Sequence, residues 1–544
     1  MSLEKIGNRT PSEYSPNRDG QEAADNAEGI PGLDKSFLFY QDKSRLPKVS
    51  HGQGIYIYDT EGKEYLDGCS GAISANLGHN NARMKEAAVA QLDKIAFTYR
   101  KQFENEPANQ LAELLVQLSP PELDRVFFVN SGSEAVETTL KIARQYWWSV
   151  NQKGKSLVLS CRPSYHGATM GALARTDYAP LNIPFVAMTG TSPKIPAPFC
   201  YHCLLDKSYP ECGIACAFEL ETTIRMYGAD NIAAFIVEPI GGASTGAAVP
   251  PDEYFPLIER ICHENNILLI IDDVMTGCGR SGTFYGYGHW DITPDIVAVS
   301  KGVSAGYTPI GAVITADYLV GPILEAGGFM HGHTYAGNPL SAAIAHEAVR
   351  IILDDSLVER SGEYGVYLHE RLHALKARYP IIGDVRGRGL FAGIEFVRDR
   401  ELRKPFPANW YVALEATEIA RAKGLLIYPR RSLCGLSGDH VLIAPPLIIE
   451  HAEIDILVER FEQTLEQLTR LLLHYMMQEK EAFKDSTVER FRVAKDLPDY
   501  AIGAIDEIGP AEDANITSAM ESGHTQTEED FYDSLHPEFK KEEE

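Results

Sequence analysis

The chain has 544 residues, of which 44% are hydrophobic and 23% are charged, with 45 glycines and 31 prolines. This composition excludes collagen, a small disulfide-stabilised protein and a wholly disordered chain, and the length indicates a large core divided over more than one domain. With 76 acidic against 50 basic residues the formal net charge is −26, which disfavours binding to nucleic acid backbones and anionic lipid surfaces. We therefore expect no nucleic acid partner and no membrane partner.

Neither end of the sequence nor its interior suggests export. The first residues, MSLEKIGNRT, lack the apolar stretch of a secretory signal, and no run approaches the ~18 apolar residues that span a bilayer. Nine cysteines, an odd number spread over several segments, favour reduced thiols over a disulfide framework. We expect a soluble cytoplasmic protein.

One group of cysteines is unusually dense. Cys200, Cys203, Cys212 and Cys216 form a CxxC pair followed by a CxxxC pair, with His202 among them. Four soft ligands on one loop can surround zinc. The second pair follows the first closely, so we favour ordinary loop cysteines and assign no metal site, while a zinc site stays open as the alternative.

The first three segments follow from changes in composition along the chain. Residues 1–36 are polar and poor in aromatic residues, so we expect a disordered N-terminal arm. Residues 37–75 form an N-terminal segment that we expect to pack with a small domain, and within it residues 54–67 alternate as a β-hairpin that turns at Glu61-Gly62. Residues 76–344 form a large α/β domain with a mainly parallel sheet, because apolar strands alternate with helical stretches such as 133–148 and 252–265. The expected strands are 125–129, 156–160, 233–237, 267–271 and 296–299.

The remaining residues predict a smaller C-terminal domain and a tail. Residues 345–478 contain a helical stretch up to residue 379, strand-like pieces at 381–396 and 424–429, and a final helix with an apolar stripe. The stripe consists of Ile454, Leu457, Val458, Phe461, Leu465, Leu468, Leu471 and Leu472. Residues 479–544 form an acidic extension, in which the part from Asp496 onward carries a net charge of −13, half of the total. Such a tail is usually solvated, although acidic tails sometimes bind partners.

Ligands of α/β proteins collect beyond the carboxyl ends of the strands. Ser131, Gly132 and Ser133 follow the strand at 125–129 and open a helix, whose N-terminus and small residues suit a phosphate. A simple helix cap at Ser131 explains this stretch equally well when it is considered alone.

Two further strand ends carry aromatic and acidic groups. Tyr165, His166 and Gly167 follow the strand at 156–160, and Tyr165 offers a face on which a planar ring can stack. A single Tyr-His pair is more often structural. Glu238 follows the strand at 233–237, where a carboxylate is suggestive only.

The strongest pair of signals comes from two wholly apolar strands. Asp272 ends the strand at 267–271, where an unpaired carboxylate is costly and needs a cationic partner. Lys301 follows the strand at 296–299, and burial lowers the pKa of a lysine toward the neutral amine that forms a Schiff base. A buried Asp272–Lys301 ion pair is the alternative.

One ligand accounts for all five strand ends. Pyridoxal 5′-phosphate (PLP) has a phosphate for Gly132 and Ser133, a flat ring for Tyr165, a pyridine nitrogen for Asp272 and an aldehyde for Lys301. A protonated ring nitrogen makes this cofactor an electron sink.

The same stretches resemble the class III (ω-type) aminotransferases of the fold-type I PLP-dependent enzymes, over about residues 37–475. The most specific stretch is 271–282, IDDVMTGCGRSG, followed by Pro294-Asp295-Ile296 and Ser300-Lys301-Gly302. Asp273 and Cys278 stand where the family usually has Glu and Phe. Other matches follow in family order at 130–135, 165–167, 238–239, 333–340, 386–390 and 444–447.

The resemblance implies a seven-stranded large-domain sheet and a role for each matching residue. Lys301 and Asp272 are the implied catalytic residues: Lys301 binds the cofactor and moves the proton, and Asp272 pairs with the ring nitrogen. Tyr165 and Val274 enclose the ring, and Thr334 reaches the phosphate of the neighbouring subunit, which makes a homodimer part of the prediction. The implied cofactor-binding set is Ser131, Gly132, Ser133, Tyr165, His166, Gly167, Glu238, Asp272, Val274, Lys301 and Thr334.

The reaction implied is transfer of an amino group from an amine or ω-amino donor to a 2-oxo acid such as pyruvate, in a ping-pong sequence. Family members that act on ornithine or 4-aminobutyrate have an arginine where this chain has Leu442, which favours an amine donor. Arg430, Arg431, Arg175 and Arg388 are candidates for the acceptor carboxylate. Arg430 and Arg431 lie nearest the position of a mobile arginine in amine transaminases, and Tyr428 is the alternative occupant of that position. The alternatives are a PLP lyase, decarboxylase or racemase of the same fold, and an inactive scaffold with a partner-binding tail.

Overall fold

The structure is a computed structural model that describes residues 38–39, 46–190 and 192–478. Residues 47–498 group into one compact unit, and all helices and strands described below belong to it. The second unit, Met1–Leu46 with Asp499–Glu544, contains only three described residues, Leu38, Phe39 and Leu46, all exposed. The expected N-terminal arm and acidic extension lie outside the described residues.

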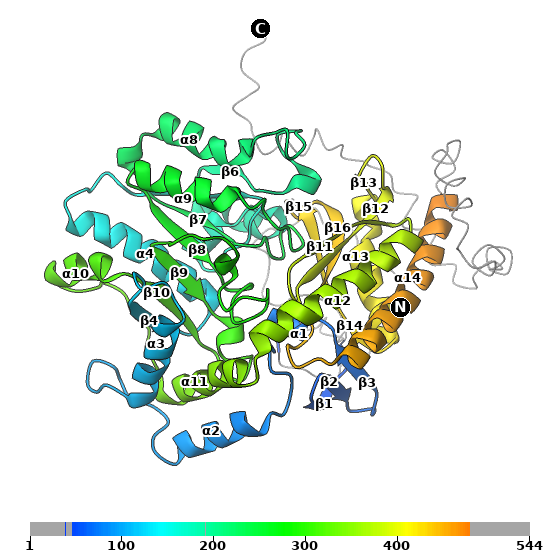
Figure 1. The fold of residues 1–544 in the computed structure, drawn as a ribbon, viewed down its shortest axis with the longest axis horizontal. Helices are drawn as coiled ribbons and strands as arrows, with labels where there is room; N and C mark the ends of the chain where they lie inside the picture. The colour runs from blue at the N-terminus through cyan, green and yellow to red at the C-terminus, as the bar shows by residue number, and fades with distance from the viewer. Residues whose placement is uncertain (1–37, 40–45, 191, 479–544) are drawn as a thin grey trace, which may run out of the picture. The chain divides into compact units, whose positions relative to one another are not determined.

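The large domain is built around a seven-stranded sheet (Figure 1). The strand order is β4-β10-β9-β8-β7-β5-β6. Only β10 runs antiparallel to its neighbours β4 and β9, and the other neighbouring pairs are parallel. The strands are β4 Arg125–Val129, β5 Leu157–Arg162, β6 Lys194–Pro196, β7 Ile232–Val237, β8 Leu268–Asp272, β9 Ile296–Val299 and β10 Gly311–Thr315.

The two faces of this sheet are covered by different helices because successive side chains of a strand point to opposite faces. In β8, Leu268 and Ile270 join a core with α4 Gly132–Ser149 and α10 Asp317–Glu325. Leu269 and Ile271 join the opposite core. That core also contains residues of α3 Glu106–Gln117, α8 Ala215–Tyr227, α9 Tyr254–Glu264 and α11 Pro339–Asp354. The other helices of this domain are α2 Ala82–Leu92 and the short α5 Met170–Arg175, α6 Ala179–Asn182 and α7 Val186–Thr189.

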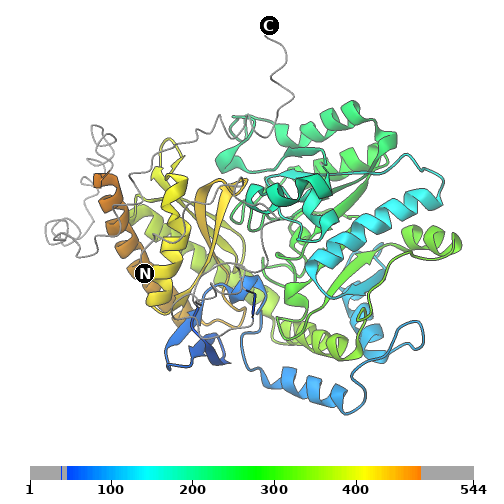
Figure 2. The ribbon, with the colours of Figure 1, turned by 180° about the vertical axis from the view of Figure 1, so that it is seen from behind.

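The small domain, seen from behind in Figure 2, has an antiparallel sheet in the order β11-β12-β16-β15, with β13 added to β12. Its strands are β11 Ile382–Gly387, β12 Ala392–Asp399, β13 Lys404–Pro405, β15 Tyr428–Leu433 and β16 Ser437–Ile443. Its helices are α12 Leu357–Arg378, α13 Val412–Ala422 and α14 His451–Gln478. The apolar stripe of α14 is buried as expected, with Leu471 partly exposed.

A third sheet contains both N-terminal and C-terminal residues. Its order is β1-β2-β3-β14, in which β14 Leu425–Leu426 pairs in parallel with β3 Glu64–Asp67. β1 Val49–Gln53 and β2 Tyr56–Asp59 complete it, followed by the short helix α1 Ser70–Ile73. The antiparallel pairing of β2 with β3 confirms the hairpin expected at 54–67.

One helix expected from the sequence is divided in the structure. The expected single helical stretch up to residue 379 is two helices, because α11 ends at Asp354 and α12 begins at Leu357. Ser356 between them has a left-handed backbone (φ 49°), which interrupts the helix without a glycine or proline. Among the described residues, no helix is long and apolar enough to cross a membrane.

Candidate active site

The predicted site residues meet at one edge of the large sheet. Val237 of β7 pairs with Ile271 of β8, and Asp272 pairs with Ala298 of β9. The parallel strands therefore end together, and the residues that follow them share one edge. This register explains why Glu238, Asp272 and Lys301, which are far apart in the sequence, influence each other electrostatically.

Lys301 stands in a strained backbone position. It begins a 3₁₀ turn, Lys301–Val303, directly after Ser300, and its φ of 45° lies in the left-handed region. Residues other than glycine occupy this region at a cost of roughly 1–3 kcal/mol, and such residues gather at functional sites. The surrounding sheet holds the lysine in place despite this cost.

The amine of Lys301 is prepared for chemistry by its surroundings. Burial lowers its pKa to about 8, with a smaller lowering from the charge of Arg430, while Asp272 and Glu238 act in the opposite direction. Near pH 8, Lys301 therefore carries a neutral amine in a substantial fraction of the molecules. Only this neutral form is nucleophilic.

Asp272 is bound by a histidine rather than by the lysine. Its Oδ2 lies 2.8 Å from Nδ1 of His166, and its Oδ1 accepts a hydrogen bond from the backbone N–H of Val274 at 3.3 Å. Asp272 is 6% exposed and His166 is 2% exposed. Among the described residues, no ion pair joins Asp272 to Lys301. The alternative of a closed Asp272–Lys301 ion pair is therefore wrong, and both groups are available to a ligand.

The start of α4 provides a tight turn of small residues. The hydroxyl of Ser131 caps the helix by accepting from the N–H of Glu134 at 3.2 Å, and Oγ of Ser133 accepts from the N–H of Ala168 at 3.0 Å. A Cβ at Gly132 would lie 2.8 Å from Cγ1 of Val274. Only glycine fits between these loops, so the backbone N–H groups at the helix start remain accessible to an anion.

The loop after β5 is fixed against the same turn. Gly167 has φ 130°, and a Cβ there would lie 2.8 Å from Oγ of Ser133. Glu238 holds the loop from the other side, because its carboxylate accepts from the N–H groups of Tyr165 at 3.1 Å and Gly242 at 2.9 Å. Burial raises the pKa of Glu238 and also that of Tyr165. The structure thus gives Glu238 a role in positioning Tyr165.

The residues present fit PLP. The helix start and its glycine suit the phosphate, Tyr165 supplies an aromatic face, and Lys301 has an amine without a carboxylate partner. His166 keeps Asp272 in place, and Nε2 of His166 is buried without a hydrogen-bond partner in the described part of the chain. These are the groups that the sequence predicts for a phosphorylated aldehyde with a basic ring nitrogen.

Two buried charged residues near the site were not predicted. Asp273 accepts hydrogen bonds from the hydroxyl of Thr276 and from the N–H of Gly286 at 2.7 Å, and burial raises its pKa to about 8. In the sequence, the signal that could have identified Asp273 was its position directly after Asp272. A Cβ at Gly286 would lie 2.7 Å from Oδ1 of Asp273, which explains a glycine here.

Arg280 connects the loop after β8 to three other parts of the chain. Its guanidinium donates to the carbonyls of Leu390 at 3.0 Å and Pro445 at 2.5 Å, to Oδ1 of Asn76 at 2.8 Å and to Oγ of Ser70 at 3.2 Å. Burial lowers the pKa of this fully buried arginine to about 9. The sequence alone gives no sign that the partners of Arg280 include backbone carbonyls of another domain.

Among the described residues, no hydrogen bond or ion pair joins Thr334 to the other predicted site residues. It is exposed, in the segment between α10 and α11. The neighbouring His333 has Nε2 3.8 Å from Oε2 of Glu134, in the first turn of α4.

Comparison with known proteins agrees with this geometry. The sequence model of the family Aminotransferase class-III matches residues 40–465. A Bacillus subtilis protein described as the uncharacterized aminotransferase YodT is 41% identical over 424 residues, 78% of this chain and 95% of its own. Putrescine–pyruvate aminotransferase of Pseudomonas aeruginosa is 34% identical, over 78% of this chain and 91% of its own.

Solved structures are similar over the same region. An (S)-enantioselective ω-transaminase from Thermomicrobium roseum has a TM-score of 0.72 and 36% identity, covering 78% of this chain and 93% of that chain. A PLP-bound amine transaminase from an uncultivated Pseudomonas species has a TM-score of 0.74 and 33% identity, covering 80% and 99%. The chain therefore belongs to the class III aminotransferases and is a PLP-dependent transaminase of fold type I.

Proposed function

We propose that this transaminase takes the amino group of an amine and passes it to a 2-oxo acid such as pyruvate, in a ping-pong sequence. The observation that carries this proposal is the arrangement around Lys301: a strained lysine with a lowered pKa, beside an aspartate that a buried histidine holds. Bound PLP supplies an aldehyde for exchange of amino groups and a ring that accepts electrons.

Each half-reaction needs a proton moved at the substrate carbon and a proton held at the ring nitrogen. We assign the first task to Nζ of Lys301, whose pKa of about 8 lets it accept and release a proton near neutral pH. We assign the second to the carboxylate of Asp272, which His166 fixes at 2.8 Å. With PLP bound, Tyr165 and Val274 would enclose the ring, and Ser131, Gly132 and Ser133 would hold the phosphate.

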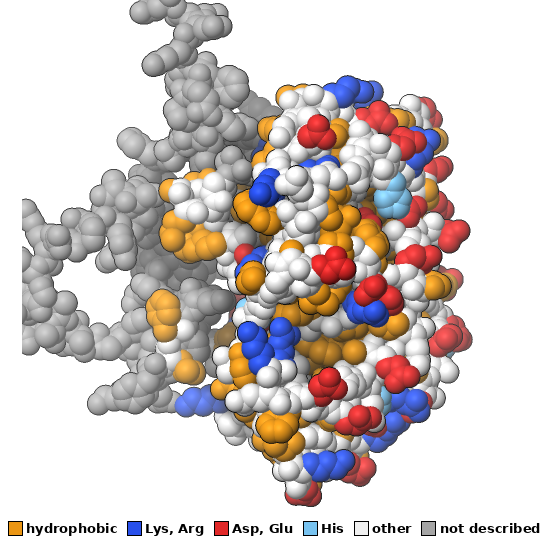
Figure 3. All heavy atoms as spheres, turned by 90° about the vertical axis from the view of Figure 1, so that its left-hand side faces the viewer, with side chains coloured by type: hydrophobic (Ala, Val, Ile, Leu, Met, Phe, Trp, Pro, Cys, Tyr) orange, Lys and Arg blue, Asp and Glu red, His pale blue; other side chains and the backbone are white. Residues whose placement is uncertain are grey.

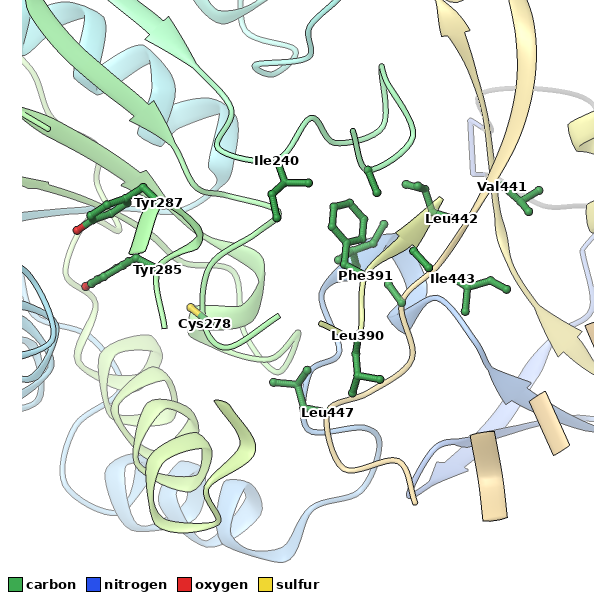
Figure 4. Close-up of a cluster of buried hydrophobic side chains, with 14 of the residues drawn as sticks. Ile240, Cys278, Tyr285, Tyr287, Leu390, Phe391, Val441, Leu442, Ile443 and Leu447 are labelled. Carbon is green, nitrogen blue, oxygen red and sulfur yellow. The ribbon is translucent and has the colours of Figure 1, made fainter. Parts of the chain in front are cut away.

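Leu442 supports an amine rather than an amino acid as donor. It is fully buried in β16, opposite Tyr428 of β15. Figure 4 shows Leu442 in a group of buried hydrophobic side chains with Ile240 and Phe391, where the two domains meet. An apolar side chain cannot pair with a second carboxylate of the donor, so an apolar amine is the better match.

Arg430 is the best candidate for the acceptor carboxylate. Arg431 pairs with Asp439 at 3.4 Å, and Arg388 pairs with Asp252 at 3.1 Å. The side chain of Arg430 instead bonds to the hydroxyl of Tyr428 and to the carbonyl of Pro429 at 3.3 Å. Its charge lowers the pKa values of both Lys301 and Tyr165, whereas Arg175 is not among the charges that influence them. In the part of the chain that the structure describes, Arg430 has no carboxylate partner, and an arginine of this kind close to the reactive amine suits a keto acid.

A homodimer is part of the proposal. Thr334 is exposed, and exposed hydrophobic side chains lie on the same and neighbouring segments: Phe97, Tyr99, Phe103, Met330 and Tyr335. The rings of Phe97 and Tyr335 are 5.7 Å apart. Figure 3 views the side of the large domain with α4 and α10, where hydrophobic side chains reach the surface between charged ones. A second copy would cover such side chains and bring its own Thr334 to the phosphate. We propose the cytoplasm as the compartment, where the nine thiols stay reduced.

Incubation of the enzyme with an amine and pyruvate tests the reaction. We expect alanine to form and the cofactor to change its absorption when the amine is added alone. Formation of ammonia without alanine would instead identify a lyase. For the acceptor, Arg430→Leu is expected to raise the KM for pyruvate by about tenfold or more, as loss of a charged hydrogen bond does, and to leave the amine half-reaction nearly unchanged. Arg388→Leu is the matched control, and equal effects of the two variants would refute the role of Arg430.

A further inference from the structure

The four dense cysteines lie outside the active-site residues, on the segment between β6 and α8. Cys200 begins a 3₁₀ turn, Cys200–His202, and Cys203 follows it directly. Cys216 is the second residue of α8, and Cys212 lies just before this helix. The four cysteines thus come from a CxxC turn and from the residues around the start of α8, and four cysteines are a usual ligand set of structural zinc sites.

The structure brings these residues together, which the sequence alone did not establish. All four cysteines line one cavity, with Phe199, Lys207, Tyr209 and Ile214 among the other lining residues. All four thiols are free. One cavity therefore brings together side chains from the 3₁₀ turn at Cys200 and from the start of α8.

We propose that Cys200, Cys203, Cys212 and Cys216 bind one Zn²⁺ ion as four thiolates. Zinc replaces the four thiol protons, so binding releases protons and removes the repulsion between thiolates. Among the described residues, no three Cys, His, Asp or Glu side chains already have the spacing of a metal site. The four cysteines line the cavity without that spacing, so binding requires their thiols to move closer together, and rotation between staggered rotamers is the motion available to a cysteine side chain.

The surroundings favour cysteine ligands and a structural ion. His202, the other potential ligand, is occupied, because its Nε2 pairs with Oε1 of the buried Glu395 on β12. The Arg403 guanidinium donates to the carbonyls of Cys200 at 3.3 Å and Tyr201 at 2.8 Å. Four thiolates carry more negative charge than one Zn²⁺ ion neutralises. Lys207 and Arg403 provide positive charge near the site that offsets the remainder. A bound ion would brace the segment that contacts the small domain through His202 and Arg403.

Metal analysis of the full-length holoenzyme, purified without added metal or chelator, tests this site. We expect about one zinc per chain in the wild type and in Cys434→Ser, a free cysteine outside the cluster, and at least a fivefold lower content in the Cys203→Ser/Cys212→Ser double variant. Replacement by Co²⁺ should give the strong visible absorption of a tetrahedral cobalt thiolate, in the wild type and Cys434→Ser only.

Alkylation of the wild type alone provides a second readout if the double variant does not fold. Iodoacetamide followed by peptide mass mapping should modify Cys200, Cys203, Cys212 and Cys216 much more slowly with added Zn²⁺ than after chelation. Absence of zinc together with equal alkylation in both conditions would overturn the proposal, and so would a disulfide between any two of the four.

Discussion

At the residue scale, the turn at the start of α4, which we propose binds the phosphate, requires glycine at position 132. A Cβ at Gly132 would lie 2.8 Å from Cγ1 and 3.3 Å from Cγ2 of Val274. Gly132→Ala should therefore push the start of α4 away from Val274 and weaken PLP binding by about tenfold, since overpacking costs roughly 1–3 kcal/mol. The dissociation constant of PLP, measured by dialysis of holoenzyme, checks this.

A double-mutant cycle separates this steric effect from other causes. In a Val274→Ala background the clash is absent, so adding Gly132→Ala should cost little further affinity. An equally large loss in both backgrounds would mean that Gly132 matters for a reason other than contact with Val274.

The protonation of Lys301 gives a prediction with a definite sign. Its pKa of about 8 means that the reactive neutral amine becomes scarcer as the pH falls below 8. The rate at which apoenzyme captures PLP, trapped by borohydride, should rise by about tenfold per pH unit below this value and level off above it. Because the Asp272 charge raises the pKa of Lys301, Asp272→Asn should move the midpoint to lower pH. A shift to higher pH would contradict the electrostatic account.

At the scale of elements, hydrogen bonds between loops stabilise the fold together with the strands. The guanidinium of Arg280 donates hydrogen bonds to the carbonyls of Leu390 and Pro445 and to the side chains of Asn76 and Ser70. Arg280→Met leaves these acceptors buried without a donor and should lower the free energy of unfolding by ~3 kcal/mol or more. The urea midpoint of the holoenzyme measures this.

Arg388→Met is the control for this prediction. Arg388 pairs with Asp252, whose side chain is 83% exposed, and exposed pairs contribute about 0–1 kcal/mol. If both variants unfolded at the same urea concentration, the buried hydrogen bonds of Arg280 would contribute no more to stability than the exposed Arg388–Asp252 ion pair.

The strands β7, β8 and β9, at whose ends Glu238, Asp272 and Lys301 lie, were predictable because they are buried on both faces. Uninterrupted apolar runs such as that ending at Asp272 are typical of such strands, and β4 and β9 have the predicted bounds. β10, which lies between them in the sheet, was not among the strands read from the sequence. It was missed although all of its residues are buried, and its antiparallel direction depends on neighbours distant in sequence.

The contacts among the site residues could not be predicted in the same way. Lys301 and Asp272 were identified from their strand ends, yet the His166–Asp272 contact joins residues 106 positions apart. The break at Ser356 was missed as well, although Asp354, Asp355 and Ser356 are residue types that favour turns and helix ends over helix interiors.

At the scale of the whole molecule, the proposed dimer predicts complementation between subunits. Thr334→Ala should weaken PLP binding by about 10–100-fold through loss of one charged hydrogen bond. Mixing Thr334→Ala chains with inactive Lys301→Ala chains, under conditions that exchange subunits, should then restore tight PLP binding at one site per mixed dimer. Such a site combines Lys301 of one chain with Thr334 of the other.

The two parental proteins kept apart are the control for this experiment. No recovery after mixing, with subunit exchange verified by mass, would show that Thr334 acts within its own chain or does not contact the phosphate.

The most direct test of the whole account is the location of the covalent bond to the cofactor. The holoenzyme is reduced with borohydride, digested and mapped by mass spectrometry, beside Lys301→Ala treated in the same way. We predict a pyridoxyl group on Lys301 alone, and for Lys301→Ala no labelled peptide and no visible absorption of bound cofactor. A pyridoxyl group on another lysine of the wild type, or unchanged absorption and turnover in Lys301→Ala, would contradict the account.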